Sequence, residues 1–240
     1  KFEKPDGVII LVPNYLLEEH SSYLGDPAST YSSNVDRFGT DVGIELIGFN
    51  GHCELNVDKS LHGGLNLDRD LLAKAIIEDG LKHLTTCYAS EVIRQAPIGT
   101  AFAKPSKETY QEFIQASALA RSSDEVAFVA TSLLWFRPKR YISRVAIDTA
   151  GISNFAEALT HLLWRLDGLP YPTVSYFSFE SYAGLEKYQP ENPDGVWAII
   201  SASTSNNLGK AMVDSWNLED DQVVTILSYA DRVPETAGTR

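Results

Sequence analysis

The sequence predicts an α/β protein with an open, mainly parallel sheet and flanking helices, preceded by an N-terminal α+β extension. Four short apolar runs in the second half of the chain are typical of buried strands: 144–147, 173–177, 196–200 and 223–227. Segments with helical spacing, 153–166 and 208–216, lie between the members of each pair, and this alternation is the pattern of a parallel sheet. A hydrophobic fraction of 44% and a charged fraction of 22% in 240 residues fit a folded globular chain and exclude a disordered or collagen-like one.

The N-terminal part is predicted to combine buried strands with one helix. Residues 7–13 and 42–49 are apolar, and 52–57 could be the hairpin partner of the second run. Leucine, alanine and isoleucine recur near helical spacing over 69–83, which predicts a helix with Gly80 near its end. No motif in this part points to a function.

The middle of the chain and its loops are less clearly patterned. A helix is predicted at 113–121, and the apolar segment 126–135 could be a buried helix or a buried strand. Polar loops are expected at 178–195 and 201–207. We therefore divide the chain into an extension of unknown role, a second α/β domain and a tail or linker, at residues 1–90, 91–230 and 231–240.

The charge balance argues against nucleic acid as a partner. The chain has 20 basic and 32 acidic residues and a net charge of −12, the wrong sign for a phosphate backbone. One local basic spot exists, for which a solvated loop is favoured over a phosphate site: Arg137, Lys139, Arg140 and Arg144. No apolar run approaches the roughly 20 residues of a membrane span, so no membrane association is expected.

The two cysteines, Cys53 and Cys87, form neither a disulfide framework nor a metal set, which favours a reducing, cytoplasmic location. No signal peptide is visible, and a start at Lys1 suggests processing or a longer parent protein. His52 beside Cys53 could suggest a catalytic dyad. Adjacent strand residues point to opposite faces, however, so we expect no dyad. The other histidines lack ligand spacing, and no metal site is predicted.

The strongest functional pattern follows the apolar run 196–200. A loop of small hydroxyl and amide residues leads directly into a helix, so several backbone N–H groups and the positive end of the helix dipole converge there, as in phosphate sites. An ordinary capped helix start is the alternative. The candidate ligand-binding residues are Ser201, Ser203, Thr204, Ser205, Asn206 and Asn207.

A second strand-to-helix junction follows the apolar run 144–147. Asp148 and Thr149 would lie at the carboxyl end of a strand, where open α/β sheets bind ligands. Ala150 and Gly151 complete the turn, and glycine permits a close backbone approach. A plain strand–helix turn is an equal alternative.

The order and spacing of these elements over about 93–230 resemble the type I phosphoribosyltransferases, most closely their orotate branch. Residues 98–107, followed by Phe113 and Ile114, are similar to the family's opening segment. Residues 147–152 stand where the family has its pyrophosphate loop, and 178–195 where it has a mobile catalytic hood. Residues 196–208 stand where it grips the 5′-phosphate and ribose of phosphoribosyl pyrophosphate. The resemblance makes Lys104, Glu180 and Lys187 possible accessory residues.

The chain departs from the family at the ribose clamp. Where the family has two adjacent acidic residues, this sequence has Ile200, Ser201 and Ala202, and asparagines replace the usual glycine of the following loop. The resemblance therefore implies a degenerate module that binds a nucleotide or phosphorylated sugar as a regulatory or sensor component. Divergent members of the superfamily are associated with bacterial antiphage defence, and orotate-type members form homodimers, so both are expectations here.

Three alternatives remain open. An active phosphoribosyltransferase of altered specificity would need Mg²⁺, with Asp148 or Glu180 taking over metal or ribose contacts. A sugar isomerase-type phosphosugar-binding domain also has a serine-rich loop after a strand, which 201–205 resembles, with 151–155 as its first turn. A protein interaction module without a small ligand would fit the 11 tyrosines, 10 phenylalanines and 4 tryptophans.

Overall fold

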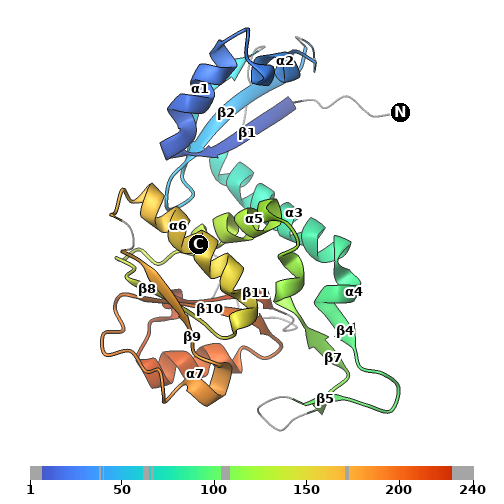
Figure 1. Cartoon of the computed structure of the whole chain (residues 1–240), viewed down its shortest axis with the longest axis vertical. Coiled ribbons are helices and arrows are strands. Elements are labelled where there is room, and N and C mark those ends of the chain that lie inside the picture. The colour runs from blue at the N-terminus through green and yellow to red at the C-terminus, as the bar shows by residue number, and fades with distance from the viewer. Residues whose placement is uncertain are drawn as a thin grey trace. The chain divides into compact units, whose positions relative to one another are not determined.

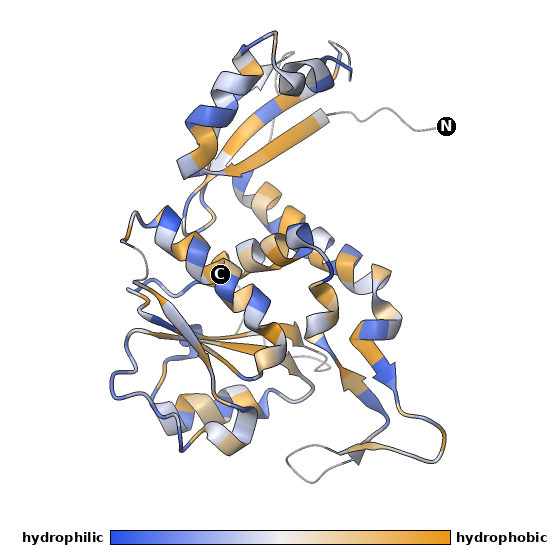
Figure 2. Cartoon of the chain, in the orientation of Figure 1, coloured by the Kyte–Doolittle hydropathy of each residue, from blue (hydrophilic) through white to orange (hydrophobic). Residues whose placement is uncertain are grey.

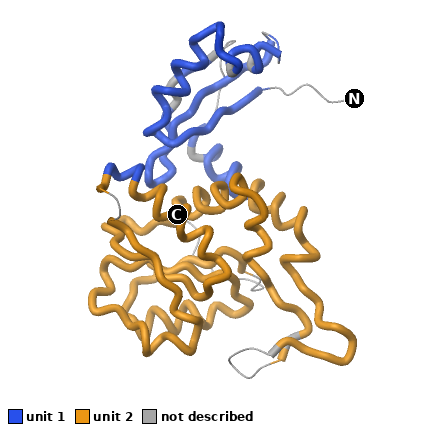
Figure 3. The backbone as a smooth tube through the Cα atoms, in the orientation of Figure 1, with its two compact units in different colours: residues 1–78, 165–168 blue, residues 79–164, 169–240 orange. Residues whose placement is uncertain are grey.

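The computed structural model describes residues 7–37, 39, 41–61, 65, 68–103, 109–170 and 173–228. The chain divides into two compact units, residues 1–78 with 165–168 and residues 79–164 with 169–240 (Figure 3). Each unit contains its own sheet. The predicted division into domains at residues 90 and 230 stays a prediction, and the expected tail lies outside the described residues.

Unit 1 is a three-stranded sheet flanked by two helices. Its strands, in spatial order, are β1 (Gly7–Pro13), β2 (Gly43–Phe49) and β3 (Leu55–Leu61). β1 and β2 are parallel and β2 and β3 antiparallel, as the hairpin prediction required, although β3 begins and ends later than expected. The parallel crossover from β1 to β2 contains a 3-10 helix (Asn14–Leu16), α1 (Leu17–Gly25) and α2 (Thr30–Asp36).

The core of unit 1 centres on β2, which is buried along its whole length. Val12, Leu24, Ile44 and Leu46 form a buried cluster between the sheet and α1. In Figure 2 β1 is mainly hydrophobic, whereas many residues of α1 are hydrophilic. The alternation along α1 therefore places the helix on one face of the sheet.

Unit 2 is built on four parallel strands, in the spatial order β11-β10-β8-β9. The strands are β8 (Arg144–Ile147), β9 (Ser175–Ser178), β10 (Val196–Ser203) and β11 (Val223–Ser228). All four had been predicted, and the fold class, an α/β protein with a mainly parallel sheet and flanking helices, is confirmed. β10 is longer than expected, because Ser201, Ala202 and Ser203 continue the strand.

Two crossover helices cover this sheet. α6 (Ser153–Leu166) joins β8 to β9, and α7 (Asn207–Trp216) joins β10 to β11. The helices lie on opposite faces (Figure 1), because the chain moves from β8 toward one edge and from β10 toward the other with right-handed crossovers. Alternate residues of the central strands therefore face opposite layers, and Val145–Ile147 and Val196–Ile200 are buried on both faces of the sheet.

The remainder of unit 2 precedes the sheet in sequence. It contains the C-terminal part of α3 (Arg69–Cys87), then α4 (Ala89–Val92), and two short antiparallel strand pairs, before a 3-10 helix (Ala116–Leu119) and α5 (Ser123–Leu134). The strand pairs are β4 (Ile93–Gln95) with β7 (Glu112–Ile114) and β5 (Phe102–Ala103) with β6 (Thr109–Tyr110). No described helix is long and apolar enough to span a bilayer.

The segment 113–121, predicted as one helix, contains the end of β7 and the 3-10 helix Ala116–Leu119, and the ambiguous segment 126–135 is helical as far as Leu134. Phe113 pairs with Arg94 in the β4–β7 ladder, so the chain there is extended. A capping box then begins α5: the Ser122 hydroxyl accepts from the Glu125 N–H, and the Glu125 carboxylate accepts from the Ser122 N–H. This local signal fixes the helix start after Ser122.

Candidate functional site

The carboxyl edge of the parallel sheet has a switch point between β8 and β10. The chain leaves these neighbouring strands in opposite directions, and α/β sheets commonly bind ligands at such a point. The turn 148–151 follows β8, and the loop 204–206 follows β10. The two segments singled out in the sequence therefore lie at one edge of one sheet.

Asp148 and Ser201 join the two strands at this edge of the sheet. The Ser201 N–H donates to Asp148 Oδ1 at 2.9 Å, and the Ser201 hydroxyl donates to Asp148 Oδ2 at 2.8 Å. Asp148 is only 7% exposed, and burial raises the pKa of its carboxyl group, opposed by these hydrogen bonds. Both residues are thus engaged with each other, and we call this pair the 148–201 brace.

The loop after β10 is shorter than predicted and turns through Asn206. Asn206 has a left-handed backbone (φ 56°, ψ 15°), a conformation that asparagine tolerates better than most residues other than glycine. Its N–H donates to the Ser203 hydroxyl at 2.7 Å. Asn206 therefore provides the backbone turn that a glycine would otherwise provide.

The amino end of α7 presents donors without partners. The first helical hydrogen bond runs from the Lys210 N–H to the Asn206 carbonyl, and the Asn206 side chain does not cap the helix. Within the described part of the chain, the N–H groups of Asn207, Leu208 and Gly209 have no acceptor. Ser205 is exposed beside them. These four residues form the donor set, which we call the α7 cradle, and it can hold an anion.

The turn after β8 is capped by its own side chains. The Thr149 hydroxyl accepts from the Gly151 N–H at 3.2 Å, and the Ser153 hydroxyl donates to the Ala150 carbonyl at 2.8 Å, around a 3-10 helix (Ala150–Ile152). A Cβ at Gly151 would meet nothing closer than 3.6 Å, so packing within the chain does not require this glycine. The turn has the features of a capped strand–helix junction.

Of the accessory residues, Glu180 and Lys187 are described, and both belong to the segment after β9. Lys104 lies outside the described residues. Glu180 and Ser181 both have left-handed backbones after β9, and the loop then packs so closely that a Cβ on Gly184 would lie 1.4 Å from the Phe179 carbonyl oxygen. Lys187 lies over the Tyr188 ring, 4.6 Å from its centroid, and hydrogen bonding to Tyr188 raises the pKa of the lysine.

The structure also shows the surroundings of two other candidates from the sequence, the basic residue Arg140 and the neighbours His52 and Cys53. Arg140 is paired with Glu219 at 2.7 Å and with Asp221 at 3.4 Å, so it holds the chain before β11 instead of a phosphate. Cys53 lies with His52 in the turn before β3, not on a strand, and has a left-handed backbone (φ 57°). Burial raises the pKa of its thiol to about 12, which leaves it protonated and supports the expectation of no dyad.

Comparison with known proteins finds similarity among solved structures, of which 13 chains match. The sequence matches no protein-family model, and no curated protein is similar to it. The fold is similar to that of orotate phosphoribosyltransferase from Francisella tularensis, with a TM-score of 0.38 and 12% identity over 61% of this chain and 82% of that one. At this level the similarity says nothing about activity. The fold class rests on the sheet order and helices of this chain.

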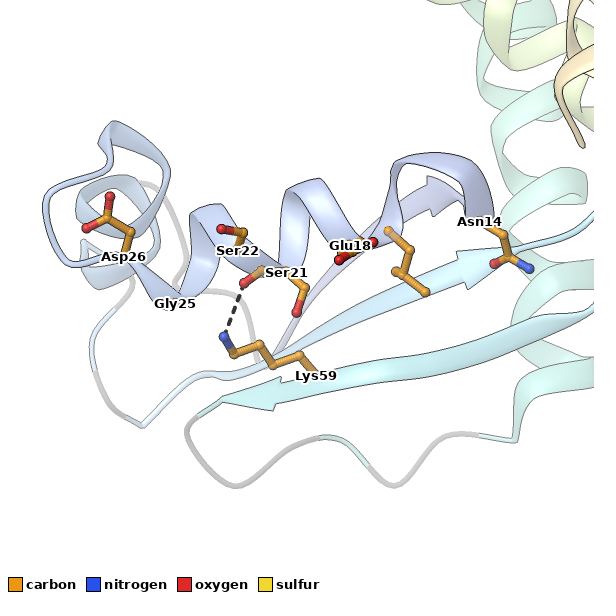
Figure 4. Close-up of a pocket in the computed structure, with 8 residues that line it drawn as sticks. Asn14, Glu18, Ser21, Ser22, Gly25, Asp26 and Lys59 are labelled. Carbon is orange, nitrogen blue, oxygen red and sulfur yellow. Dashed lines mark hydrogen bonds between the residues drawn. The ribbon is translucent and has the colours of Figure 1, made fainter.

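Unit 1 contains an open groove that the sequence did not suggest. It has a volume of about 800 Å³ and lies between α1 and β3 (Figure 4). The Lys59 ammonium donates to the Ser21 carbonyl at 3.2 Å and reaches the helix at Gly25, where a Cβ would lie 2.9 Å from it. Glu18 and Asp26 line the same groove. Lys59 therefore acts as a tie between strand and helix. In the described residues no cluster of three or more metal-ligating side chains occurs here or elsewhere.

Proposed function

We propose that this chain binds a nucleotide or a phosphorylated sugar at the carboxyl edge of its parallel sheet and acts as a regulatory or sensor module without transferring a phosphoribosyl group. The α7 cradle carries this proposal. Three adjacent N–H groups without partners and an exposed hydroxyl meet at a topological switch point, where a phosphate would satisfy the donors and interact favourably with the helix dipole.

The cradle suits a phosphate in an acidic protein. The net charge of −12 repels anions at long range, and no described lysine or arginine is part of the donor set. Recognition therefore depends on oriented backbone amides, which act at short range and are already in place before binding. This arrangement favours a bound phosphate monoester over a polyphosphate.

The 148–201 brace argues against phosphoribosyl transfer. A transferase must hold the ribose hydroxyls and stabilise a leaving diphosphate, usually with carboxylates and Mg²⁺. Here the carboxylate of Asp148 already accepts two hydrogen bonds from Ser201. The residues that follow Ser201 in β10 are Ala202 and Ser203, neither of which has a carboxylate. An active transferase would need Mg²⁺ and a different use of Asp148.

A ligand panel with a matched pair of variants tests the proposal. Ser205→Asp places a carboxylate in the cradle. Ser123→Asp makes the same change in the first turn of α5, another exposed helix start. Thermal unfolding would be followed with ribose 5-phosphate, glucose 6-phosphate, nucleoside monophosphates and phosphoribosyl pyrophosphate, each with and without Mg²⁺.

We expect at least one phosphate ester to stabilise the native chain and Ser123→Asp, but not Ser205→Asp. Ligand at a hundred times its Kd adds about 2.7 kcal/mol, or a rise in Tm of about 5–10 °C. No shift with any phosphate ester, or equal shifts in both variants, would refute the site. A Mg²⁺-dependent shift restricted to phosphoribosyl pyrophosphate would support the active transferase, and a preference for glucose 6-phosphate would support a phosphosugar domain.

The wider role is tested separately. The regulatory proposal, with bacterial defence as one setting, predicts that the ligand alters an association of the chain. Sedimentation velocity with and without ligand would show a homodimer or a partner complex whose stability depends on the ligand. An unchanged sedimentation coefficient at saturating ligand would argue against regulation through self-association.

A further inference from the structure

A second pocket lies at the opposite, amino edge of the same parallel sheet. Its volume is about 710 Å³, within the range of small-molecule sites. Residues at the start of three strands, β8, β9 and β10, and residues of the loop before β10 line the pocket. They include Arg144, Tyr176, Phe177, Tyr188, Gln189 and Asn192. None of these residues belongs to the α7 cradle. We propose that this pocket binds a planar heteroaromatic ring with both a donor and an acceptor on its edge, the chemistry of a nucleobase.

The pocket has a rigid aromatic wall. The Phe177 and Tyr188 rings have centroids 6.3 Å apart, and Phe177 also stacks on Trp216 at 6.3 Å and 25°. Trp216 is buried and held by a hydrogen bond of 2.6 Å from its indole N–H to the Leu185 carbonyl. The wall is therefore fixed by the core, so a planar ring can stack on it without ordering the aromatic side chains first.

Arg144 adds a second flat surface. Its guanidinium lies 5.8 Å from the centroid of the Phe177 ring. Among the described residues no carboxylate lies within ion-pair distance of it. Arginine commonly stacks on bases and donates to their carbonyl oxygens. An unpaired arginine in an aromatic pocket thus has the geometry for ring recognition.

Two amides in the lining each have one group held by a hydrogen bond and one group with no partner among the described residues. The Gln189 amide N–H donates to the Ser215 carbonyl at 2.8 Å, which leaves its Oε1 as an acceptor. The Asn192 Oδ1 accepts from the Asp194 N–H at 3.1 Å, which leaves its NH₂ as a donor. A donor and an acceptor held in one pocket match the edge of a nucleobase, where the two functions lie side by side.

The charge of the lining favours the ring over a phosphate. Glu191 also lines the pocket, and its carboxylate offsets the charge of Arg144. A dianionic phosphate would meet this carboxylate, whereas a neutral ring would not. The pocket should therefore bind a free base, a nucleoside or the base of a nucleotide through the same contacts.

The test uses the full chain and two pocket variants with a matched control. Arg144→Met removes the guanidinium and keeps a long side chain. Asn192→Asp keeps an oxygen that can accept from the Asp194 N–H and replaces the amide donor by a charged carboxylate oxygen. Arg94→Met is the control, because Arg94 is also an exposed strand arginine but lies in β4. Saturation-transfer NMR would be recorded with adenosine, guanosine, cytidine and uridine, and with their free bases and 5′-monophosphates.

We expect at least one nucleoside to bind with a Kd of about 1 mM or tighter, with saturation strongest at its ring protons. Arg144→Met and Asn192→Asp should each weaken binding about tenfold, and Arg94→Met should leave it unchanged. Ser205→Asp should also leave it unchanged, which separates this site from the α7 cradle. Absence of saturation for every ring, or binding only of monophosphates that Ser205→Asp abolishes, would overturn the proposal.

Discussion

Removal of the Asp148 side chain is the sharpest test of the brace between β8 and β10. In Asp148→Ala, the Ser201 N–H and hydroxyl both lose their acceptor at a half-buried position. An unsatisfied donor costs about 1–3 kcal/mol, and because water can reach part of Ser201 we expect a total loss of about 2 kcal/mol in the free energy of unfolding. Asp148→Asn is the informative comparison, since the amide can accept from the N–H and donate to the hydroxyl of Ser201.

The two variants should differ most in their pH dependence. Burial raises the pKa of Asp148 in the folded chain above its ordinary value of 3.8, so the folded state holds this proton more tightly than the unfolded state. The stability linked to the carboxyl group is therefore fully present below the ordinary value and is lost as the pH rises through the raised one. Asp148→Asn removes this loss, so relative to the native chain it should gain stability as the pH rises from about 3.5 to neutrality.

Urea unfolding followed by far-UV circular dichroism, at several pH values in that window, measures both effects. Ser201→Ala provides the control, because it removes one hydrogen bond and keeps the N–H contact. If Asp148→Ala unfolds at the same urea concentration as the native chain, the brace is not a stabilising contact. If Asp148→Asn shows no relative gain with pH, burial does not raise the pKa of Asp148 above its ordinary value.

Three further predictions concern individual residues. Asn206→Gly should change the free energy of unfolding by less than about 0.5 kcal/mol, whereas Asn206→Val should lower it by about 1–2 kcal/mol, because a β-branched residue is strained in the left-handed region. Chemical denaturation of both variants measures this difference, and equal stabilities would contradict the prediction. Gly184→Ala should destabilise the chain by about 2 kcal/mol or more because its Cβ would collide with the Phe179 carbonyl, while Gly151→Ala should be nearly neutral; the Tm values of the two variants should separate clearly. Iodoacetamide in mildly alkaline buffer should modify the exposed Cys87 and spare Cys53, whose pKa is about 12; mass spectrometry that finds both modified in the native chain would refute the buried turn.

The sequence predicted the parallel sheet because its strands carry uninterrupted aliphatic runs. Val145–Ile147 and Val196–Ile200 are buried on both faces, and such strands can be recognised without knowledge of their partners. The amphipathic crossovers α6 and α7 were predicted for a similar local reason.

The errors occurred where distant partners decide the structure. Ala202 and Ser203 have no strand-like composition, but they pair with Leu227 and Ser228 of β11 and so extend β10. Phe113 is extended because it pairs with Arg94. Neither partnership is visible in a local window, since both depend on the tertiary fold.

The candidate site was predicted in part. Both segments at the carboxyl edge were identified from their residue types, and the geometry places them at one switch point. Asp148 and Ser201 are 53 positions apart in the chain. The sequence therefore could not show that these two candidate residues are hydrogen-bonded to each other. The pocket at the amino edge was missed because it is assembled from the starts of three strands that share no motif.

The strand order of unit 2 has a consequence for synthesis on the ribosome. β8 is an inner strand of its sheet, yet it is translated before both of its neighbours, β9 and β10. One edge of β8 can pair once β9 has emerged, but the edge that pairs with β10 stays open until Val196–Ser203 has been translated. The strands of unit 1 have all been translated well before this point. Any pause or truncation between β8 and β10 would leave a nascent chain with an open hydrophobic strand, the form most exposed to aggregation and to capture by chaperones.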